Sequence, residues 1–457
     1  MFLLIMDKNI NNIIRQDLAR FRGLLKQHDN FYDINQLHAL AKYPFLLSYP
    51  QVKKYWKQYI DMGIRNNKDL KNVDLYLHIP FCRSKCSYCL FPSMPLKGKA
   101  QAEGYIDYLT EEMHFYSNVF RNIEFRNIYI GGGTPSILSS VQMNRLLKNM
   151  FGYFAFRKEG QRTSECNPHS ASKPVFSVLR DYGFNRISFG VQSLNTKALR
   201  VNKRDYQDFK IVKQRISEAK RFGFTDINVD LIVGLAGDTL EGFKNSFTKV
   251  AKLKPYNIVV YGLMPPRNSY LADNFHMNKY DYFTYHYPLM IKKALRVMAV
   301  ICKKYGYIPD SLDSSKFHWG FRDRGHSGED PGSGYAGEYA GCTLGLGSFS
   351  RSHIHGLLEY RNSKYASHFN LRDRIFEAKK ITLKDEMAKY IINCLDRESR
   401  ISLSMFNKIF GENLIKAFPY AIYALKQLKL IYYAKDNLIF RFRNPEDKYI
   451  YGMFFLK

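Results

Sequence analysis

The sequence predicts an α/β protein, a partial (β/α)6 TIM-like barrel followed by a small C-terminal helical, winged-helix-like domain. Between residues 74 and 265, short β-rich runs alternate with amphipathic helical stretches, as in proteins with a parallel sheet. Polar residues fall in or at the ends of successive runs, and the carboxyl ends of parallel strands are where βα folds bind ligands. After about residue 380, three helical stretches precede a hairpin pattern.

The barrel is expected over residues 74–265, after a helical N-terminal extension of residues 1–73 that is polar in character. Its predicted strands are the runs 74–79, 126–130, 163–167, 186–192, 227–235 and 257–263. Amphipathic stretches such as 102–120 and 140–154 are predicted to be connecting helices. A doubly wound sheet also fits the alternation, but polar residues at strand after strand favour a lumen that opens at one face.

The rest of the chain is predicted to be a substrate-lining extension, residues 266–375, and the winged-helix-like module, residues 376–457. Within the extension, residues 313–350 are rich in Gly and Ser, and loops of that length are usually functional or disordered. His318 and Trp319 favour an ordered loop that lines a site. The module is predicted from a hairpin that turns at Asp436-Asn437 and from helices at 383–396, 402–411 and 418–430.

The composition is that of a strongly basic protein without a membrane segment. The chain has 457 residues and a formal net charge of +28, which suits an anionic partner. Lys and Arg are scattered along the whole chain, so a solvated basic background is the favoured interpretation, and nucleic acid is not the expected partner. No apolar run reaches the roughly 18 residues of a membrane span. The opening MFLLIM is shorter than the core of a secretory signal, which indicates a cytoplasmic protein.

Three of the seven cysteines are clustered. Seven are too few and too unevenly placed for a disulfide framework, and the four that lie apart are expected to be inert: Cys166, Cys302, Cys342 and Cys394. Cys82, Cys86 and Cys89 form the pattern CxxxCxxC. A structural zinc site needs four ligands, so a Cys3His site with His78 is an alternative. Three thiolates favour a [4Fe–4S] cluster with one iron open to a substrate or cofactor.

This motif, with Tyr88 before the last cysteine, resembles the signature of the radical S-adenosylmethionine (SAM) superfamily. Further stretches occur in the order found in the oxygen-independent coproporphyrinogen III oxidase-like family, namely YLHIPFC, IYIGGGTPSIL, RISFGVQSLN, INVDLIVGL and LGLGSFSRS. The resemblance covers roughly residues 74–360. It implies a [4Fe–4S] cluster that cleaves SAM reductively to methionine and a 5′-deoxyadenosyl radical, which abstracts hydrogen from the substrate. It also implies a reducing electron donor such as flavodoxin or ferredoxin.

The resemblance places the cluster on the three clustered cysteines and assigns no catalytic residue. It implies SAM contacts at Tyr76, Tyr88, Gly132, Gly133, Thr134, Glu165, Gln192, Arg204, Asp230, Gly262 and Arg351. In this assignment the glycines meet the amino group of SAM, Glu165 the ribose hydroxyls and Arg204 the carboxylate. The hydroxyl of Tyr76 would lie near the sulfonium and the ring of Tyr88 against the adenine. Asp230 lies amid apolar neighbours, where a carboxylate is costly to bury without a partner, and this favours a ligand role.

Two positions depart from the oxidase pattern. Phe91 stands where the oxidase has one further cysteine, and in this respect the chain resembles the heme-chaperone and radical methyltransferase branches of the family. Arg351 brings a cation where the oxidase has an apolar residue, which argues against a second SAM site of the oxidase type.

Three functions therefore remain open. The first is a radical SAM enzyme that acts on a tetrapyrrole or related conjugated substrate, by a reaction like the oxidative decarboxylation of coproporphyrinogen III in heme metabolism or by radical methyl transfer. The second is a heme-binding chaperone that uses a residue such as His318, His353 or His355. The third, an RNA-modifying radical enzyme, is supported only by the net charge and the winged-helix-like module.

Overall fold

The computed structural model groups the chain into two compact units. The barrel unit comprises Leu46–Ile354 and Glu359–Ala378, and the C-terminal unit comprises Met1–Phe45, His355–Leu358 and Lys379–Lys457. The residues that the structure describes are 12–23, 45–65, 73–263, 287–310, 312, 318–324, 341–363, 375–397, 399–442 and 447–456. The division predicted from sequence, into residues 1–73, 74–265, 266–375 and 376–457, stays a proposal.

Six parallel strands form the centre of the barrel unit. In sheet order, which is also chain order, they are β2 (Val73–Ile79), β6 (Ile128–Gly132), β8 (Arg162–Cys166), β9 (Arg186–Gln192), β10 (Asp226–Val233) and β11 (Asn257–Gly262). All six predicted runs are strands. Because each strand pairs with the next one along the chain, every connection returns over the same face of the sheet. The α/β barrel fold predicted from sequence is confirmed.

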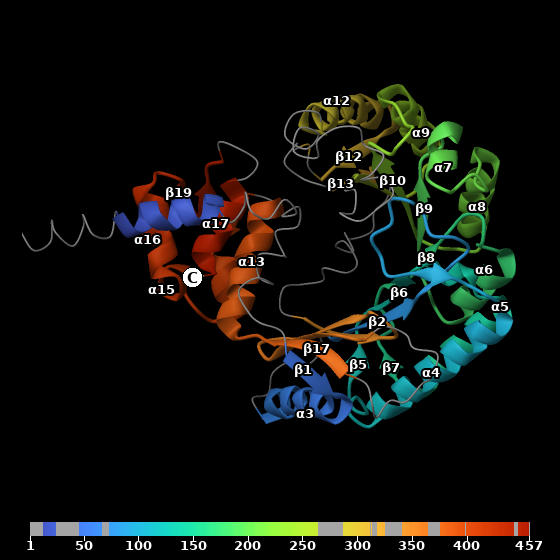
Figure 1. Ribbon diagram of the computed structural model, residues 1–457, viewed down its shortest axis with the longest axis horizontal. Coiled ribbons are helices and arrows are strands. Elements are labelled where there is room, and N and C mark those ends of the chain that lie inside the picture. The colour runs from blue at the N-terminus through green and yellow to red at the C-terminus, as the bar shows by residue number, and fades with distance from the viewer. Residues whose placement is uncertain are drawn as a thin grey trace, which may run out of the picture. The chain divides into compact units, whose positions relative to one another are not determined.

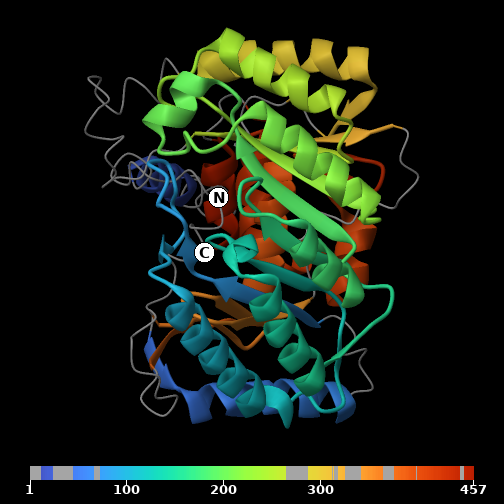
Figure 2. The same ribbon diagram turned by 90° about the vertical axis from the view of Figure 1, so that its right-hand side faces the viewer.

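The connecting helices cover the outer face of the curved sheet (Figure 1). They are α4 (Lys99–Ser117), α5 (Ser140–Tyr153), α6 (Lys173–Asp181), α8 (Phe209–Arg221) and α9 (Leu240–Lys252). Figure 2 shows them lying in front of the strands. The start of α5 illustrates how the sequence sets these helices: Ser139 accepts a hydrogen bond from the Gln142 backbone, and the Gln142 side chain accepts one from the Ser139 backbone. No described helix is long and apolar enough to cross a membrane.

Within the described part of the chain, further strands extend the sheet at both edges to thirteen. Beyond β2 lie β14 (Cys342–Leu346), β15 (Arg351–Ile354), β16 (Leu358–Arg361), β17 (Ile375–Lys380) and β1 (Phe45–Ser48). Beyond β11, after α12 (Tyr287–Tyr305) in the chain, lie β13 (His318–Asp323) and β12 (Tyr307–Pro309).

The prediction of one long loop over residues 313–350 is therefore wrong for two of its segments. Leu344 and Leu346 of β14 are completely buried. In β13, Phe321 is completely buried and Trp319 is about 1% exposed. Burial of these apolar side chains outweighs the weak strand propensity of the intervening glycines. Residues 313–317 and 325–340 lie outside the described part of the chain.

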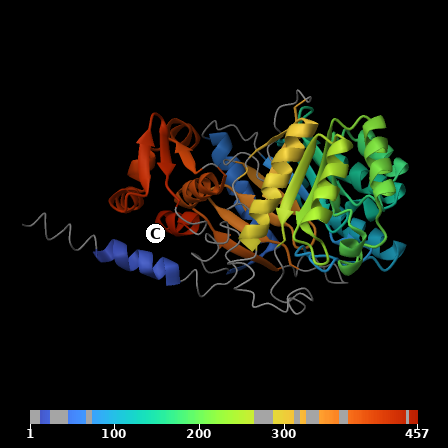
Figure 3. The same ribbon diagram turned by 90° about the horizontal axis from the view of Figure 1, so that it is seen from above.

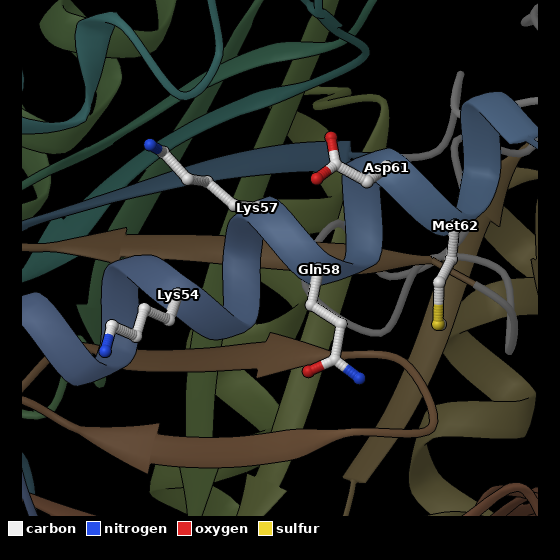
Figure 4. A pocket seen from close by; sticks show the side chains of 5 residues that line it. All are labelled: Lys54, Lys57, Gln58, Asp61 and Met62. Carbon is white, nitrogen blue, oxygen red and sulfur yellow. The ribbon is translucent and has the colours of Figure 1, made fainter.

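One helix of the predicted N-terminal extension, α3 (Tyr49–Arg65), belongs to the barrel unit. Trp56 is completely buried, and its indole Nε1 donates a hydrogen bond to the Tyr360 hydroxyl at 2.8 Å. The opposite, solvent-facing side of α3 carries Lys54, Lys57, Gln58, Asp61 and Met62, which line a shallow hollow (Figure 4).

The C-terminal unit has the order of elements typical of a winged helix (Figure 3). Along the chain these are α13 (Leu383–Arg397), β18 (Arg400–Ser402), α14 (Leu403–Phe410), α15 (Leu414–Ala417), α16 (Pro419–Gln427), β19 (Ile431–Ala434) and β20 (Asn437–Phe440). The strand order is β18-β20-β19. A helix over residues 12–23 and α17 (Asp447–Phe455) complete the unit, with the rings of Phe21 and Phe454 5.1 Å apart.

The hairpin turns one residue earlier than predicted. Ala434 pairs with Asn437, so the two turn residues are Lys435 and Asp436. Lys435 has a φ of 52°, and the Asp436 carboxylate accepts hydrogen bonds from the Ser402 and Ser404 hydroxyls. These bonds fix Asp436 as the second residue of the turn, so the turn is formed by Lys435-Asp436 and not by Asp436-Asn437.

Candidate functional site

The cysteine loop, residues 82–95, begins and ends in a short pair of strands, β3 (Phe81–Cys82) and β4 (Met94–Pro95). The Cys89 backbone N–H donates to the Cys86 carbonyl at 3.1 Å, which turns the loop back on itself. All seven cysteines are free, and the three of the loop are half-buried. The loop therefore presents three unpaired thiols at the carboxyl end of β2.

Neighbouring groups point hydrogen-bond donors at these thiols. The Thr134 hydroxyl donates to the Sγ of Cys82 at 3.4 Å, and the Arg204 Nη1 donates to the Sγ of Cys86 at 3.7 Å. Burial raises the pKa of Cys82 and of Cys89. A metal ion can replace the proton of such buried thiols, because the thiolate is the form of cysteine that binds metals.

The donor set fits a cluster held by three thiolates better than it fits zinc. His78 is the candidate fourth zinc ligand, but its Nε2 is 3.0 Å from the Pro92 carbonyl and its Nδ1 is 3.0 Å from the Tyr76 hydroxyl. Both ring nitrogens are thus engaged within the protein. The buried Nε of Arg204 has no hydrogen-bond partner among the described residues, so a donor remains for a ligand at the same place.

The glycine stretch after β6 lies directly against the cysteine loop. A Cβ on Gly132, whose φ is 111°, would lie 2.6 Å from the His78 ring, and a Cβ on Gly133 would lie 3.0 Å from the Sγ of Cys82. The Gly133 and Thr134 backbone N–H groups donate to the carbonyls of Ile79 and Phe81. Only glycine allows the end of β6 to approach β2 this closely.

Two half-buried carboxylates lie on the inner side of the sheet. Glu165, at the end of β8, accepts hydrogen bonds from the Tyr129 hydroxyl at 2.7 Å and from the Gly132 backbone at 3.2 Å. Burial raises the pKa of Glu165 to about 7. Asp230 accepts from Ser188 at 3.0 Å and from Asn228 at 2.8 Å, and burial raises its pKa as well. The two carboxylates repel each other, which adds to the shift of Glu165.

Arg204 is buried beside the cysteine loop and fixed by neutral groups. Its Nη2 donates to the Gly190 carbonyl at 2.5 Å and to the Gln207 side chain at 2.9 Å. Gln207 is itself held by the Val191 and Ser193 carbonyls at 2.7 and 3.2 Å. The guanidinium therefore points at Cys86 from a rigid position at the end of β9.

Tyr88 lies over an apolar group made of Ala198, Ile232, Leu235 and Leu263. Ile232 and Leu235 lie at and after the end of β10, and Leu263 follows β11. Burial raises the pKa of Tyr88 well above its usual value. Gln192 ends β9 in a left-handed conformation with a φ of 68°, which is uncommon for a residue with a side chain. Gly262 ends β11 opposite Val233.

The structure brings most of the predicted site residues together, with one exception. Glu165 connects several of them. The Gly132 backbone and the Tyr129 hydroxyl donate to it, and the rings of Tyr129 and Tyr76 are 6.1 Å apart. Asp230 is near enough to raise the pKa of Glu165. The cysteine loop with Thr134 and Arg204 adjoins these residues through Gly133. Arg351 begins β15 with an exposed side chain, and its role in the site stays a prediction.

Comparison with known proteins identifies a domain in part of the chain. Residues 76–250 match the sequence profile of the Radical SAM superfamily. The chain contains a radical SAM domain. Proteins with this domain use a [4Fe–4S] cluster and SAM, so the predicted cofactors are confirmed at the level of the superfamily.

Curated relatives match the radical SAM domain over part of their length. The oxygen-independent coproporphyrinogen III oxidase of Escherichia coli K12 is 33% identical over 189 residues, which are 41% of this chain and 41% of the oxidase. The heme chaperone HemW of Lactococcus lactis is 38% identical over 189 residues, 41% of this chain and 48% of HemW. The chain thus spans less than half the length of either relative.

A solved structure supports the fold over a longer stretch. Coproporphyrinogen III oxidase (HemN) from E. coli superimposes with a TM-score of 0.69 at 22% identity, over 84% of this chain and 90% of that chain. The likeness extends beyond the radical SAM domain and shows that the two proteins share a fold.

Several residues of the site were not predicted from the sequence. Tyr129 donates to Glu165, Ser188 and Asn228 donate to Asp230, and Gln207 accepts from Arg204. Asn228 and Asp230 are two residues apart on one strand and so face the same side of the sheet. Tyr129, Ser188 and Asn228 could have been identified from the sequence, because each is a polar residue on the same face of a largely apolar strand.

Proposed function

We propose that this protein is a radical SAM enzyme that acts on a tetrapyrrole, in a reaction like that of the oxygen-independent coproporphyrinogen III oxidases. The observation that carries the proposal is the placement of three half-buried thiols next to a lumen with two half-buried carboxylates, Glu165 and Asp230. The similarity to the oxidases over the radical SAM domain supports the substrate class. A substrate with several carboxylates also suits the net charge of +28.

Cys82, Cys86 and Cys89 would hold the cluster, which when bound supplies the electron that cleaves SAM. The hydroxyl of Thr134 and the guanidinium of Arg204 donate to two of the thiols and so favour the thiolate forms that bind iron. The apolar contacts of Tyr88 would exclude water from this side of the site.

The lumen residues would bind SAM. The Glu165 carboxylate would accept hydrogen bonds from the ribose hydroxyls, and the backbone at Gly132 and Gly133 would meet the amino group. Asp230 and Gln192 would contribute further polar contacts. The Nε of Arg204, which has no hydrogen-bond partner among the described residues, would donate to the SAM carboxylate. Tyr88 and the apolar residues beside it would contact the adenine ring.

The test is anaerobic reconstitution with iron and sulfide, reduction in the presence of SAM, and an assay for 5′-deoxyadenosine. The wild type is expected to form it, and Cys82→Ala is expected to lose both the iron–sulfur absorbance and the product. Cys394→Ala, which changes a cysteine outside the loop, is the matched control. Normal absorbance and product in Cys82→Ala would contradict the assignment. Added coproporphyrinogen III should raise the rate of SAM consumption.

A heme chaperone is the second candidate, favoured by Phe91 at the position of the additional oxidase cysteine and by the 38% identity with HemW. His318 of β13 is exposed, and His353 of β15 is half-buried and 3.1 Å from Glu359. His355, the third candidate histidine, is half-buried and its Nδ1 is 3.5 Å from the Glu386 carboxylate. Heme binding that shifts the Soret absorbance, is lost in a histidine variant and occurs without SAM turnover would support this function over the enzyme.

The remaining candidates have distinct signatures. Radical methyl transfer would consume two SAM molecules per turnover and release S-adenosylhomocysteine. An RNA-modifying activity would require RNA binding that weakens with added salt.

A further inference from the structure

Two segments that carry side-chain hydroxyls flank Cys82. On one side, β3 pairs in parallel with β4, so that Cys82 stands opposite Pro95. The Leu96 backbone N–H donates to the Cys82 carbonyl at 2.9 Å. This pairing holds the end of the cysteine loop, which contains Ser93, against the first cysteine. On the other side, Thr134 follows the glycine stretch after β6.

The Thr134 hydroxyl donates to the Sγ of Cys82 at 3.4 Å. Thr134 is the N-cap residue of the short 3-10 helix Pro135–Ile137, a position at which threonine usually accepts a hydrogen bond from the first turn. Its side chain makes no such capping bond here. The hydroxyl is therefore directed at the cysteine, and its replacement by a methyl group removes no helix cap.

The Ser93 hydroxyl is buried and has no hydrogen-bond partner among the described residues. A buried hydroxyl without an acceptor lowers the stability of a fold, and its hydrogen can rotate toward an acceptor within reach. Burial raises the pKa of the Cys82 thiol, and the hydroxyls of Thr134 and Ser93 partly offset this rise. The Cys82 sulfur is thus within reach of Ser93, and a thiolate there would supply the missing acceptor.

The other two cysteines of the loop have different surroundings. The Nη1 of Arg204 donates to the Sγ of Cys86 at 3.7 Å, whereas the Sγ of Cys89 is 4.0 Å from the Phe91 carbonyl, which is an acceptor. Within the described part of the chain, no side chain donates a hydrogen bond to Cys89. A thiolate at Cys82 would therefore accept from two neutral hydroxyls, while a thiolate at Cys89 would accept from none of the described side chains.

We propose that Ser93 and Thr134 donate hydrogen bonds to the Cys82 thiolate and so raise the reduction potential of the iron–sulfur cluster. The inference rests on the proposed function, which places the cluster on this cysteine. Reduction adds one electron and no proton, so the negative charge on the thiolate sulfurs increases, and hydrogen-bond donors stabilise that charge. The family resemblance implies a SAM contact for Thr134, whereas this inference assigns its hydroxyl to a cluster ligand. Both residues act through Cys82 and are positioning residues.

The experiment measures the midpoint potential of the reconstituted full chain without SAM. An anaerobic potentiometric titration sets the potential, and electron paramagnetic resonance quantifies the reduced state. Thr134→Val and Ser93→Ala each remove one hydroxyl. At the wild-type midpoint, the ratio of reduced to oxidised protein is expected to fall at least about threefold in each variant. In Ser93→Ala/Thr134→Val the ratio is expected to fall at least about tenfold, a shift of about 59 mV for one electron.

Ser87→Ala is the matched control, because Ser87 is another half-buried serine of the cysteine loop. Its hydroxyl donates to the Val201 carbonyl at 3.4 Å, so the variant is expected to keep the wild-type potential. Ser93→Thr and Thr134→Ser retain a hydroxyl and are expected to keep that potential as well. An unchanged potential in Thr134→Val or Ser93→Ala would overturn the proposal. An equal shift in Ser87→Ala or Thr134→Ser would do the same.

The wild type distinguishes this inference from the proposed function. A wild type that forms no iron–sulfur absorbance would contradict the proposed function and overturn this inference with it. A wild type that forms the cluster, with every variant sharing its potential, would overturn only the role of the two hydroxyls. A lower potential in the variants without a hydroxyl, at unchanged iron content, supports the inference whatever the rate of SAM cleavage.

Discussion

Glu112 and Glu165 are two carboxylates of the barrel unit with the same pKa and different surroundings. Burial raises the pKa of each to about 7. Glu112, on α4, has no exposed surface and accepts hydrogen bonds from the Tyr49 hydroxyl at 2.7 Å, the Gly347 backbone at 2.8 Å and the Asn362 amide at 2.9 Å. Glu165 is half-buried and accepts from Tyr129 and Gly132.

The difference shows that a shifted pKa alone does not identify a ligand-binding residue. The donors of Glu112 come from α3, from the turn after β14 and from the segment after β16, so this carboxylate joins three parts of the barrel unit. The donors of Glu165 come from one strand, and the carboxylate keeps capacity to accept from a ligand. We therefore expect changes at Glu112 to affect stability and changes at Glu165 to affect SAM binding.

The largest effect is expected for Glu112→Ala. The variant removes the carboxylate that accepts from the Tyr49 hydroxyl, the Gly347 N–H and the Asn362 amide, and loss of a buried hydrogen-bond partner costs about 1–3 kcal/mol per group. The free energy of unfolding of the barrel unit should fall by about 3 kcal/mol, measured by urea denaturation. Glu111→Ala, at the neighbouring exposed position of α4, is the control and should change it by less than about 0.5 kcal/mol. Equal effects of the two variants would show that the Glu112 network does not stabilise the fold.

The pH dependence of stability gives the next largest effect. Because burial raises the folded pKa of Glu112 above its ordinary value of 4.5, the protonated form is favoured by folding. Its contribution to stability is fully present below about pH 4.5 and is lost as the pH rises through about 7, to a total of about 3 kcal/mol. Glu112→Gln cannot ionise, so its urea midpoint should fall less than that of the wild type between about pH 5 and about pH 8. Parallel pH profiles would contradict this.

A smaller effect, on binding rather than on folding, is expected for Glu165→Gln. The amide replaces an acceptor oxygen by a donor, and hydrogen bonds to a charged group are worth about 1.5–3 kcal/mol. The dissociation constant for SAM should rise at least about tenfold at pH 8, measured by equilibrium dialysis of the reconstituted protein. Wild-type binding should tighten as the pH rises through about 7, and the variant should lose this dependence. An unchanged constant would remove Glu165 from the SAM site.

The smallest effect is expected for Tyr129→Phe. The Tyr129 hydroxyl holds the pKa of Glu165 below the value that burial alone would give. Without this hydroxyl the pKa should rise further, and the pH at which SAM binding tightens should move upward by less than about one unit. The pH profile of the SAM dissociation constant measures this shift. A downward shift would show that the hydroxyl does not act on the carboxylate.

The sequence predicts the parts of the fold that depend on local patterns. Most of the six parallel strands are rich in apolar residues, although β8 is polar, and the three cysteines lie within eight residues of one another. The winged-helix-like module follows from helical periodicity and from turn residues. The cysteine loop was predicted from its CxxxCxxC spacing, and the glycine stretch, Glu165 and Asp230 were predicted from positions in or at the end of a strand together with the family resemblance.

The remainder depends on contacts between distant segments. Nothing in the local sequence indicates that β14 pairs with β2, because that pairing joins residues on opposite sides of the radical SAM domain. Residue type alone does not distinguish Glu112 from the exposed Glu111 next to it. Helical spacing does, because Glu112 lies three residues after Leu109 and four before Tyr116, both of which are buried. That spacing placed it on the inner face of α4. Its partners Gly347 and Asn362 could not be inferred.

The pairing of β14 with β2 has a consequence for synthesis on the ribosome. The edge of β2 that receives β14 stays unpaired until Cys342–Leu346 has been made, roughly 260 residues after β2 is complete, which at about 5–20 residues per second takes about 13–50 s. During that interval an apolar parallel strand presents unpaired backbone groups. The nascent chain should therefore depend on a chaperone, and slower translation after residue 263 should lengthen that dependence.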